Sequence, residues 1–255
     1  MSAFDVTLVL PIKGASDVRR FNKILRPSMD KIRGCKLLII TDEKLDPLGT
    51  EYLPAKVVSD KSFNIEVGMG GWHKQQVLKL KAWKFIDTEW ILTLDADCVF
   101  LFEGHIKLLM PGGKPFLSWS GKLGAAQEGW WDKSAKSLGK PKPDTRCGVT
   151  PMFLKKQICK ELDEGHDIVS MIEGGATEYS LYWVFGGKVE DYHKENLVLP
   201  KDAYWNVGGD VLKEAGRIYH SAGRLGLVQS TSEKQDKWKD KDLLGKLIEI
   251  YERRP

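Results

Sequence analysis

The chain has 255 residues, 42% of them hydrophobic and 29% charged, and its 39 basic and 35 acidic residues give a formal net charge of +4. This is the composition of a globular protein with a substantial core, which argues against intrinsic disorder. Because the basic excess is small and forms no dense block, we expect no nucleic-acid partner, whereas an anionic small substrate or weak peripheral contact with a membrane surface remains compatible with the charge.

The first residues and the cysteines indicate a cytoplasmic protein. The apolar run Val6–Ile12 contains a proline and is too short for a secretory signal or for the ~20 residues that span a bilayer. None of the four cysteines forms a Cys-x-x-Cys pair, and three lie in apolar surroundings: Cys35, Cys98, Cys147 and Cys159. This favours buried free thiols in a reducing compartment over disulfides, so we expect no transmembrane segment and a cytoplasmic location.

The N-terminal half predicts strands and helices in alternation. Continuous apolar and β-branched runs predict strands at Val6–Gly14, Cys35–Asp42, Ala55–Asp60 and Trp90–Leu101. Helices are expected from Ser16, as N-cap, to a break or kink at Pro27, and again over Trp72–Ile86. This order predicts an α/β fold with a mostly parallel sheet covered by helices on both faces.

Beyond Glu103 the pattern is less regular. Residues 111–146 predict loops and one strand, at "PFLSWS". A helix is expected with Thr150 as N-cap and Gly165 after its end, and a shorter helix over Thr177–Gly186. Strand-like "NLVLP" and "RIYHS" follow, and an amphipathic helix from Leu243 closes the chain.

Asp95 and Asp97 lie between two apolar runs in "WILTLDADCVFL". Two acids one residue apart point to the same side of an extended chain, and ligands of open α/β sheets bind outside the carboxyl ends of the strands. Carboxylate oxygens suit Mg²⁺ or Mn²⁺, and such an ion would relieve the repulsion and bridge to substrate phosphates. The alternative is that both acids cap a turn and face solvent.

A strand that ends in Asp-Ala-Asp, in a chain that opens with "LVLPIKG", resembles the GT-A type glycosyltransferases. The closest match is "GWHKQQVLKLKAWKFIDTEWILTLDADCVF", because many of these enzymes place a helix with Gln and Lys just before the DxD strand. The resemblance implies one GT-A domain, a Rossmann-like α/β fold. Residues 1–103 would be its nucleotide-sugar-binding half and residues 104–255 its irregular acceptor-binding half.

The resemblance also implies the reaction and its metal. A sugar would pass from a nucleotide-diphosphate donor, with UDP-sugars favoured, to a hydroxyl of a glycan, lipid or protein, with Mn²⁺ or Mg²⁺ as cofactor. Asp97 matches the acid that binds the metal directly, and Asp95 the acid that reaches the donor ribose, or the metal through water. His220, in "RIYHSAG", matches a late metal ligand, although a structural histidine is the alternative.

Further positions match contacts to the nucleotide. They are Pro11, Ile12 and Lys13 in the loop after the first strand, Asp42 at the end of the second, and Lys74, Gln76 and Lys79 on the helix before Asp95. One or two of the last three could reach the diphosphate, whereas plain surface positions are the alternative for the lysines.

Glu178 is the candidate general base. It shares a helical face with Leu181, Tyr182 and Phe185, so an acid lies on an otherwise inward face, where a buried carboxylate is costly without a partner. The resemblance implies that it takes the proton of the acceptor hydroxyl, in an inverting transfer. A capping acid in the first helical turn is the alternative.

Two other functions fit parts of the sequence. Haloacid-dehalogenase-like phosphatases also have DxDx[T/V] after an apolar strand, which would make Asp95 a nucleophile and Asp97 an acid/base with Mg²⁺, and "GGDVLKE" imitates their late acidic motif. That motif normally opens the domain, however. A non-catalytic carbohydrate-binding protein is the other alternative, and it would need no metal.

Overall fold

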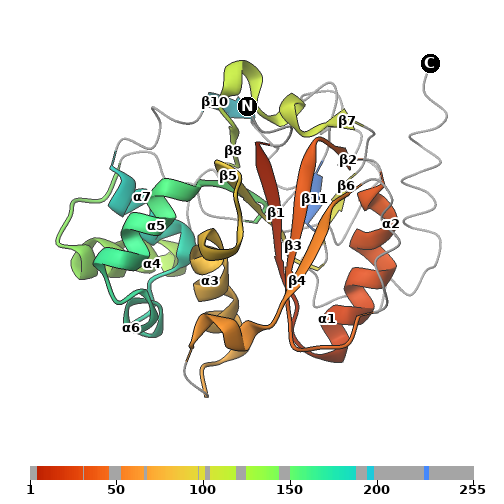
Figure 1. The fold of residues 1–255 in the computed structure, drawn as a ribbon. Helices are drawn as coiled ribbons and strands as arrows, with labels where there is room; N and C mark the ends of the chain where they lie inside the picture. Colours follow the sequence, from red (N-terminus) through yellow and green to blue (C-terminus); the bar gives the residue numbers. More distant parts are fainter. Residues whose placement is uncertain are drawn as a thin grey trace.

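The structure, a computed structural model, describes residues 5–30, 32–45, 53–65, 68–96, 98–100, 104–118, 125–143, 150–187, 194–197 and 227–229. Its centre is a five-stranded sheet with the order β4-β3-β1-β5-β9 (Figure 1). The strands are β1 (Val6–Pro11), β3 (Cys35–Ile40), β4 (Ala55–Val58), β5 (Trp90–Thr93) and β9 (Met152–Lys155). The first four are parallel and β9 is antiparallel to β5, so the predicted α/β fold with a mostly parallel sheet is confirmed.

Helices cover both faces of the sheet (Figure 1). On one face lie α1 (Gly14–Arg20), a π-helical turn (Phe21–Leu25) and α2 (Arg26–Met29). On the other lie α3 (Gly71–Lys81), α5 (Lys156–Gly165), α6 (Ile168–Glu173) and α7 (Glu178–Gly186). Another helix, α4 (Ala125–Leu138), packs against α6 and α7. Short 3-10 segments are Asp60–Phe63, Ala82–Phe85, Ile106–Leu109 and Pro111–Gly113.

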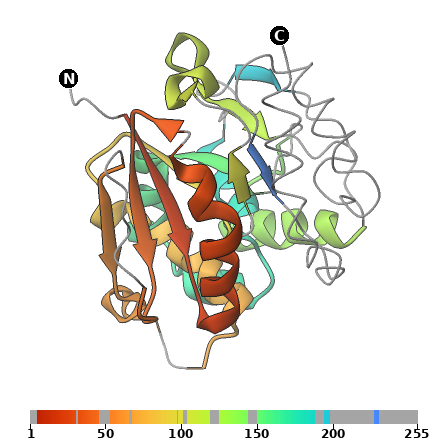
Figure 2. The same ribbon diagram turned by 90° about the vertical axis from the view of Figure 1, so that its right-hand side faces the viewer.

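In the described ranges, three two-stranded pairs lie apart from the main sheet, and Figure 2 shows them in a second view. They are β2 (Ile32–Arg33) with β7 (Gly104–His105), β6 (Cys98–Phe100) with β11 (Leu227–Gln229), and β8 (Phe116–Ser118) with β10 (Lys194–Leu197). The predicted strands at "PFLSWS" and "NLVLP" overlap β8 and β10, whereas "RIYHS" and the closing helix lie outside the described residues.

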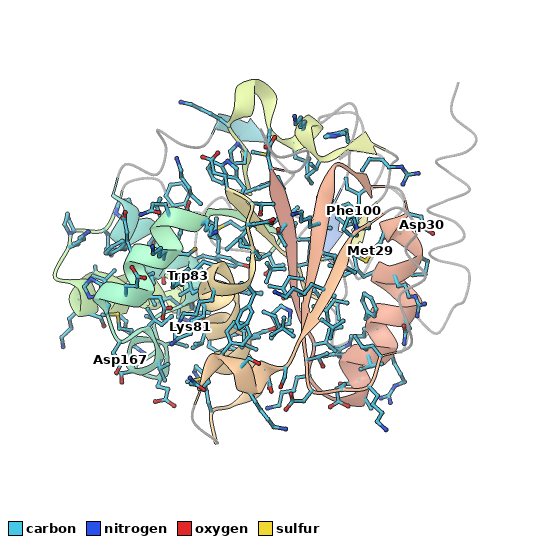
Figure 3. The ribbon with its side chains drawn as sticks, viewed as in Figure 1. Met29, Asp30, Lys81, Trp83, Phe100 and Asp167 are labelled. Atoms are coloured by element: carbon cyan, nitrogen blue, oxygen red, sulfur yellow. The ribbon has the colours of Figure 1, made fainter. Side chains whose placement is uncertain are left out.

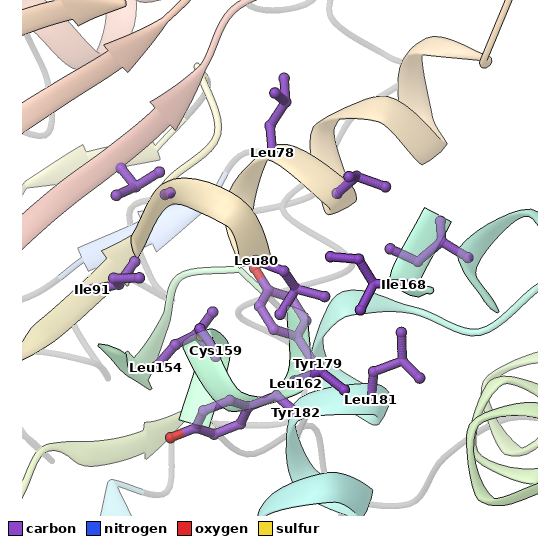
Figure 4. Close-up of a cluster of buried hydrophobic side chains, with 14 of the residues drawn as sticks. Leu78, Leu80, Ile91, Leu154, Cys159, Leu162, Ile168, Tyr179, Leu181 and Tyr182 are labelled. Carbon is purple, nitrogen blue, oxygen red and sulfur yellow. The ribbon is translucent and has the colours of Figure 1, made fainter. Parts of the chain in front are cut away.

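The side chains of β1 alternate between two hydrophobic clusters, as a strand buried on both faces requires. Leu8 and Leu10 pack with Phe21 on the face of α1 and α2, where Met29 lies beside Phe100 (Figure 3). Val9 belongs to the opposite cluster, which α3, α5 and α7 fill with large apolar side chains (Figure 4). Leu80, Leu154, Leu162, Leu181 and Tyr182 are fully buried there.

The stretch predicted as one strand over Trp90–Leu101 is two strands with a break. β5 ends at Thr93, and β6 begins at Cys98. Between them the chain turns, because the backbone N–H of Cys98 donates to the carbonyl of Asp95 over 3.0 Å. The expectation that Asp95 belongs to an extended chain is therefore wrong. The turn brings its carboxylate to the end of the buried strand, with its side chain 22% exposed.

Three predicted helix features are also wrong. The helix expected to start at Thr150 starts at Lys156, since the apolar residues before it form β9, buried on both faces. In the first helix the N-cap is Lys13 and not Ser16. Residues 111–146, predicted as loops and one strand, contain the helix α4.

Two further expectations concern the membrane and the thiols. Across the part of the chain that the structure describes, no helix combines the length and apolar character needed to cross a bilayer. Cys35, Cys98 and Cys159 are buried free thiols, as predicted, and Cys147 lies outside the described residues.

Candidate functional site

A cavity of about 410 Å³ opens at the carboxyl edge of the sheet, between α1 and α3. Its position follows from the strand order. The chain runs outward from β1 to β3 and β4, then crosses to β5 on the other side of β1. The helices after β1 and before β5 therefore lie on opposite faces and diverge at this point, which is where open α/β sheets bind their ligands.

Five of the predicted site residues line this one cavity. Pro11, Ile12 and Lys13 line it from the loop after β1, Lys74 from α3, and Asp95 from the turn after β5. These residues are far apart in sequence, and the parallel strands bring them to the same edge.

The N-terminus of α3 forms one wall of the cavity. The helix starts after Gly70, which provides no side-chain cap, so its first N–H groups are not satisfied by a cap. A Cβ atom at Gly71 would lie 3.4 Å from Nζ of Lys13, which shows that this ammonium is beside the helix start. Helix N-termini and ammonium groups both attract phosphate, so this wall is suited to an anion.

The opposite faces of α3 explain why two predicted residues are absent from the lining. Gly71, Lys74 and Leu78 follow one another at intervals of three and four and face the cavity. Gln76 and Lys79 point instead to α7, where Oε1 of Gln76 accepts from the backbone N–H of Glu178 over 3.2 Å. The resemblance implied that one or two of Lys74, Gln76 and Lys79 reach the diphosphate, and of these three Lys74 lines the cavity.

Lys79 lies inside the protein, 1% exposed, and its Nζ contacts four oxygen atoms. It donates to Asp95 Oδ1 over 2.7 Å and to Thr150 Oγ1 over 3.0 Å. Glu178 Oε1 lies 3.4 Å away and the hydroxyl of Tyr179 3.5 Å away. Burial alone would lower the pKa of Lys79, but the nearby oxygens, those of Asp95 above all, raise it well above its ordinary value. The positive charge beside Asp95 is thus Lys79.

Glu178 is buried in the first turn of α7 and is not among the residues that line the cavity. The N-cap of this helix is Thr177, whose side chain forms a capping box with Ser180. Burial raises the pKa of Glu178, and Lys79 acts in the opposite direction. Its role as a base stays a prediction.

Asp42 lies at the end of β3 but does not line the cavity. Its Oδ1 accepts from the hydroxyl of Ser59, and its Oδ2 lies 2.9 Å from Nζ of Lys61. Hydrogen bonds from Ser59 and then Lys61 lower the pKa of Asp42 to about 2. Both of its oxygens therefore have partners within the protein.

The metal site is described only in part. Asp95 provides a hard carboxylate of the kind that Mn²⁺ and Mg²⁺ prefer, whereas Asp97 and His220 lie outside the described residues. Within the described ranges, no three His, Cys, Asp or Glu side chains gather closely enough to hold an ion. The carboxylate of Asp95 is therefore a suitable ligand for such an ion, and metal binding stays a proposal.

Asp60 and Trp72 are two of the cavity-lining residues that the sequence did not mark as site residues. Asp60 follows β4, and its carboxylate forms an ion pair with Lys74. Trp72, in the first turn of α3, is 48% exposed, and its ring lies 6.1 Å from that of Trp130 on α4. The available signal for Asp60 was an acid at the last position of the predicted strand Ala55–Asp60, but no local signal marks Trp72.

Comparison with known proteins identifies a family whose function is unknown. A model described as a family of unknown function (DUF6492) matches residues 5–207. No curated protein matches the chain.

Proposed function

Because the chain belongs to DUF6492, a family of unknown function, we propose its activity from its own residues. We propose that it is a GT-A type glycosyltransferase. It moves a sugar from a nucleotide-diphosphate donor, with UDP-sugars favoured, to a hydroxyl of a glycan, lipid or protein, and it requires Mn²⁺ or Mg²⁺.

The observation that supports this most is the meeting of Asp95, Lys13 and the start of α3 around one cavity at the switch point of the sheet. An acid that suits a divalent ion is there combined with two features that suit phosphate. A nucleotide diphosphate needs both, because its phosphates are negative and are commonly shared with a metal ion. The cavity volume, about 410 Å³, lies in the usual range for small-molecule sites.

In this proposal the protein groups have separate tasks. Lys13 and the α3 N-terminus hold the diphosphate. Asp95, with Asp97 and His220 from the sequence prediction, would hold the ion, which when bound would neutralise charge on the departing diphosphate. Lys79 fixes the carboxylate of Asp95 from inside the protein, so that residue is held in place before any ligand binds.

Glu178 is proposed as the base that takes the proton of the acceptor hydroxyl. A carboxylate whose pKa is raised by burial is better matched to proton transfer near neutral pH than an ordinary one. The role requires the acceptor hydroxyl to come within hydrogen-bonding distance of this side chain when both substrates are bound.

The direct test is nucleotide release from UDP- and GDP-sugars with Mn²⁺, measured with and without a chelator. We expect metal-dependent release in the native protein and none in Asp97→Ala. Hydrolysis of simple phosphate esters with a trapped phosphoenzyme at Asp95 would instead support the phosphatase alternative. Binding of sugars without metal dependence, and without turnover, would support the carbohydrate-binding alternative.

A further inference from the structure

Trp72 presents a large apolar side chain at the cavity that the protein itself leaves open to solvent. About half of the residue is exposed, and in the part of the chain that the structure describes only Val57, on the edge strand β4, is a comparably exposed large hydrophobic residue. Trp72 lines the cavity, and its carbonyl accepts a hydrogen bond from the side chain of Gln76, which holds this first turn of α3. An open indole at a cavity is suited to contact with a ligand.

The ring of Trp72 connects the cavity to α4. Its centroid lies 6.1 Å from that of the Trp130 ring, and the two ring planes are tilted by 44°. A Cβ atom at Gly129, the residue before Trp130, would meet nothing within 4 Å, so α4 leaves open space at this point. α4 packs in turn against α7, which carries Glu178. The two tryptophans therefore join the proposed donor cavity to the helices of the proposed acceptor half.

The side chains on this wall fit a sugar ring. The face of an indole is electron-rich, so it attracts the C–H groups of a pyranose, which carry a partial positive charge. Gln75, three residues after Trp72, lines the same cavity, and its carboxamide can both donate to and accept from hydroxyl groups. A stacking face beside such a group matches a molecule that is apolar on its faces and hydroxylated at its edges.

The extent of the apolar surface argues against a lipid or a protein in this place. Such partners bind to a contiguous apolar patch of several large side chains. Within the described ranges, this wall exposes one indole, and Trp130 beside it is only partly exposed. A single indole face is comparable in size to one sugar ring, which is the smaller of these ligands.

We propose that Trp72 and Gln75 bind a sugar ring of the acceptor, which makes the acceptor a glycan. This assignment rests on the proposed function. Trp72 follows Gly71, where Lys13 lies beside the start of α3, so the sugar would be held next to the diphosphate and on the side of α4. The donor's own sugar has the same chemistry, and a comparison of UDP with UDP-sugars separates the two sources.

The test is saturation-transfer NMR with UDP and Mn²⁺ present. The probes are the methyl glycosides of glucose, galactose, mannose and N-acetylglucosamine, and the disaccharides lactose, maltose and cellobiose. At least one of them should receive saturation at its ring C–H protons from the native protein. Trp72→Ala should weaken that binding by roughly 10-fold, and Trp72→Phe should weaken it less, because it keeps an aromatic face.

Two more variants complete the comparison. Gln75→Ala should weaken binding by roughly 3- to 10-fold, as expected for one lost hydrogen bond. Val57→Ala is the matched control, since it removes the other exposed apolar side chain, and it should bind the sugar as the native protein does. The inference is overturned if none of the sugars binds, or if Trp72→Ala binds them with native affinity. It is also overturned if octyl glucoside binds and methyl glucoside does not, which would indicate a lipid.

Calorimetry with Mn²⁺ separates the acceptor from the donor. The affinities of UDP-glucose and UDP-galactose relative to UDP should be the same in Trp72→Ala as in the native protein. A loss confined to the UDP-sugars would place the donor's sugar at Trp72 and overturn the acceptor assignment. If the protein binds none of UDP, GDP, ADP and CDP but still binds sugars through Trp72, the proposed function fails while the sugar site stands, which is a different result.

Discussion

Lys79 places one positive charge between two carboxylates inside the protein, with Nζ 2.7 Å from Asp95 and 3.4 Å from Glu178. Removal of one partner from a buried ion pair leaves a charge that is neither hydrated nor paired. We therefore expect Lys79→Met to lower the free energy of unfolding by ~3–5 kcal/mol, measured by urea denaturation at neutral pH.

The control is Lys36→Met, since Lys36 pairs with Asp87 at the surface, where Asp87 is 71% exposed. That change should cost less than ~1 kcal/mol. The double variant Lys79→Met with Glu178→Gln should recover part of the lost stability, because the buried carboxylate of Glu178 is then removed and only Asp95, whose side chain is 22% exposed, has lost the ammonium of Lys79. Equal effects of the two lysine substitutions would show that the Lys79 network contributes little to stability.

Glu178→Gln tests the proposed base. The change keeps the size of the side chain and removes its ability to accept a proton, so transfer should fall by ~10² to 10⁴-fold while nucleotide affinity stays near native. Product analysis by NMR should show an inverted anomeric configuration. Near-native turnover, or a retained configuration, would mean that Glu178 is not the base of an inverting transfer.

The difference in unfolding free energy between the native protein and Glu178→Gln should depend on pH. Burial raises the pKa of Glu178 above its ordinary value of 4.5, so the folded protein holds this proton more strongly than the unfolded chain does. The native protein should thus be most stable relative to Glu178→Gln below that ordinary value. It should lose relative stability as the pH rises through the folded pKa. Urea denaturation of both proteins between about pH 4 and pH 7 measures the trend, and an opposite slope would contradict it.

At the scale of elements, Asp163 on α5 connects that helix to the segment that ends α3. Its side chain is 4% exposed and lies 3.2 Å from Nζ of Lys81 and 2.9 Å from Nζ of Lys84, and it accepts from the indole N–H of Trp83 over 3.0 Å. Figure 3 labels Lys81 and Trp83 on this side of the sheet. Burial opposes the charged form, but the hydrogen bond from Lys84 and the charge of Lys81 lower the pKa of Asp163 overall.

Asp163→Ala should therefore destabilise the protein by ~2–4 kcal/mol at neutral pH, because two lysines and an indole lose their common acceptor. A carboxylate with a lowered pKa stabilises the fold above its unfolded pKa and loses that effect as the pH falls through the folded value. The difference in unfolding free energy between native and variant should shrink in acid. A difference that is constant with pH would assign the effect to packing alone.

The sequence predicted the parallel strands well, because β1, β3 and β5 are short apolar runs buried on both faces. The prediction failed where one apolar pattern fits both a strand and a helix. The apolar residues of β9 also fit a helical face with those of α5, and local periodicity cannot separate a strand from the helix that follows it. The break after Thr93 depends on a turn that no apolar pattern records.

The candidate site, like the fold, could be predicted from the sequence only in part. Asp95 and Lys13 follow strands, and the rule that ligands bind at the carboxyl edge locates both without a structure. The direction of Lys79 depends on how α3 rotates against α7, which is set by packing across the whole core. The ion pair of Asp60 with Lys74 depends on how the end of β4 meets α3 at the cavity, so the sequence could name neither contact.

At the scale of the whole molecule, the central claim is that the cavity between α1 and α3 binds a nucleotide diphosphate with a divalent ion. The most direct test is the thermal unfolding temperature with UDP and Mn²⁺, in the native protein and in variants of the acid pair. A ligand at a hundred times its Kd stabilises the folded state by ~2.7 kcal/mol, which raises that temperature measurably. We predict a rise that a chelator removes, that is absent in Asp97→Ala and that is reduced but present in Asp95→Ala. No rise with any of UDP, GDP, ADP and CDP, or an equal rise in the native protein and both variants, would contradict the claim.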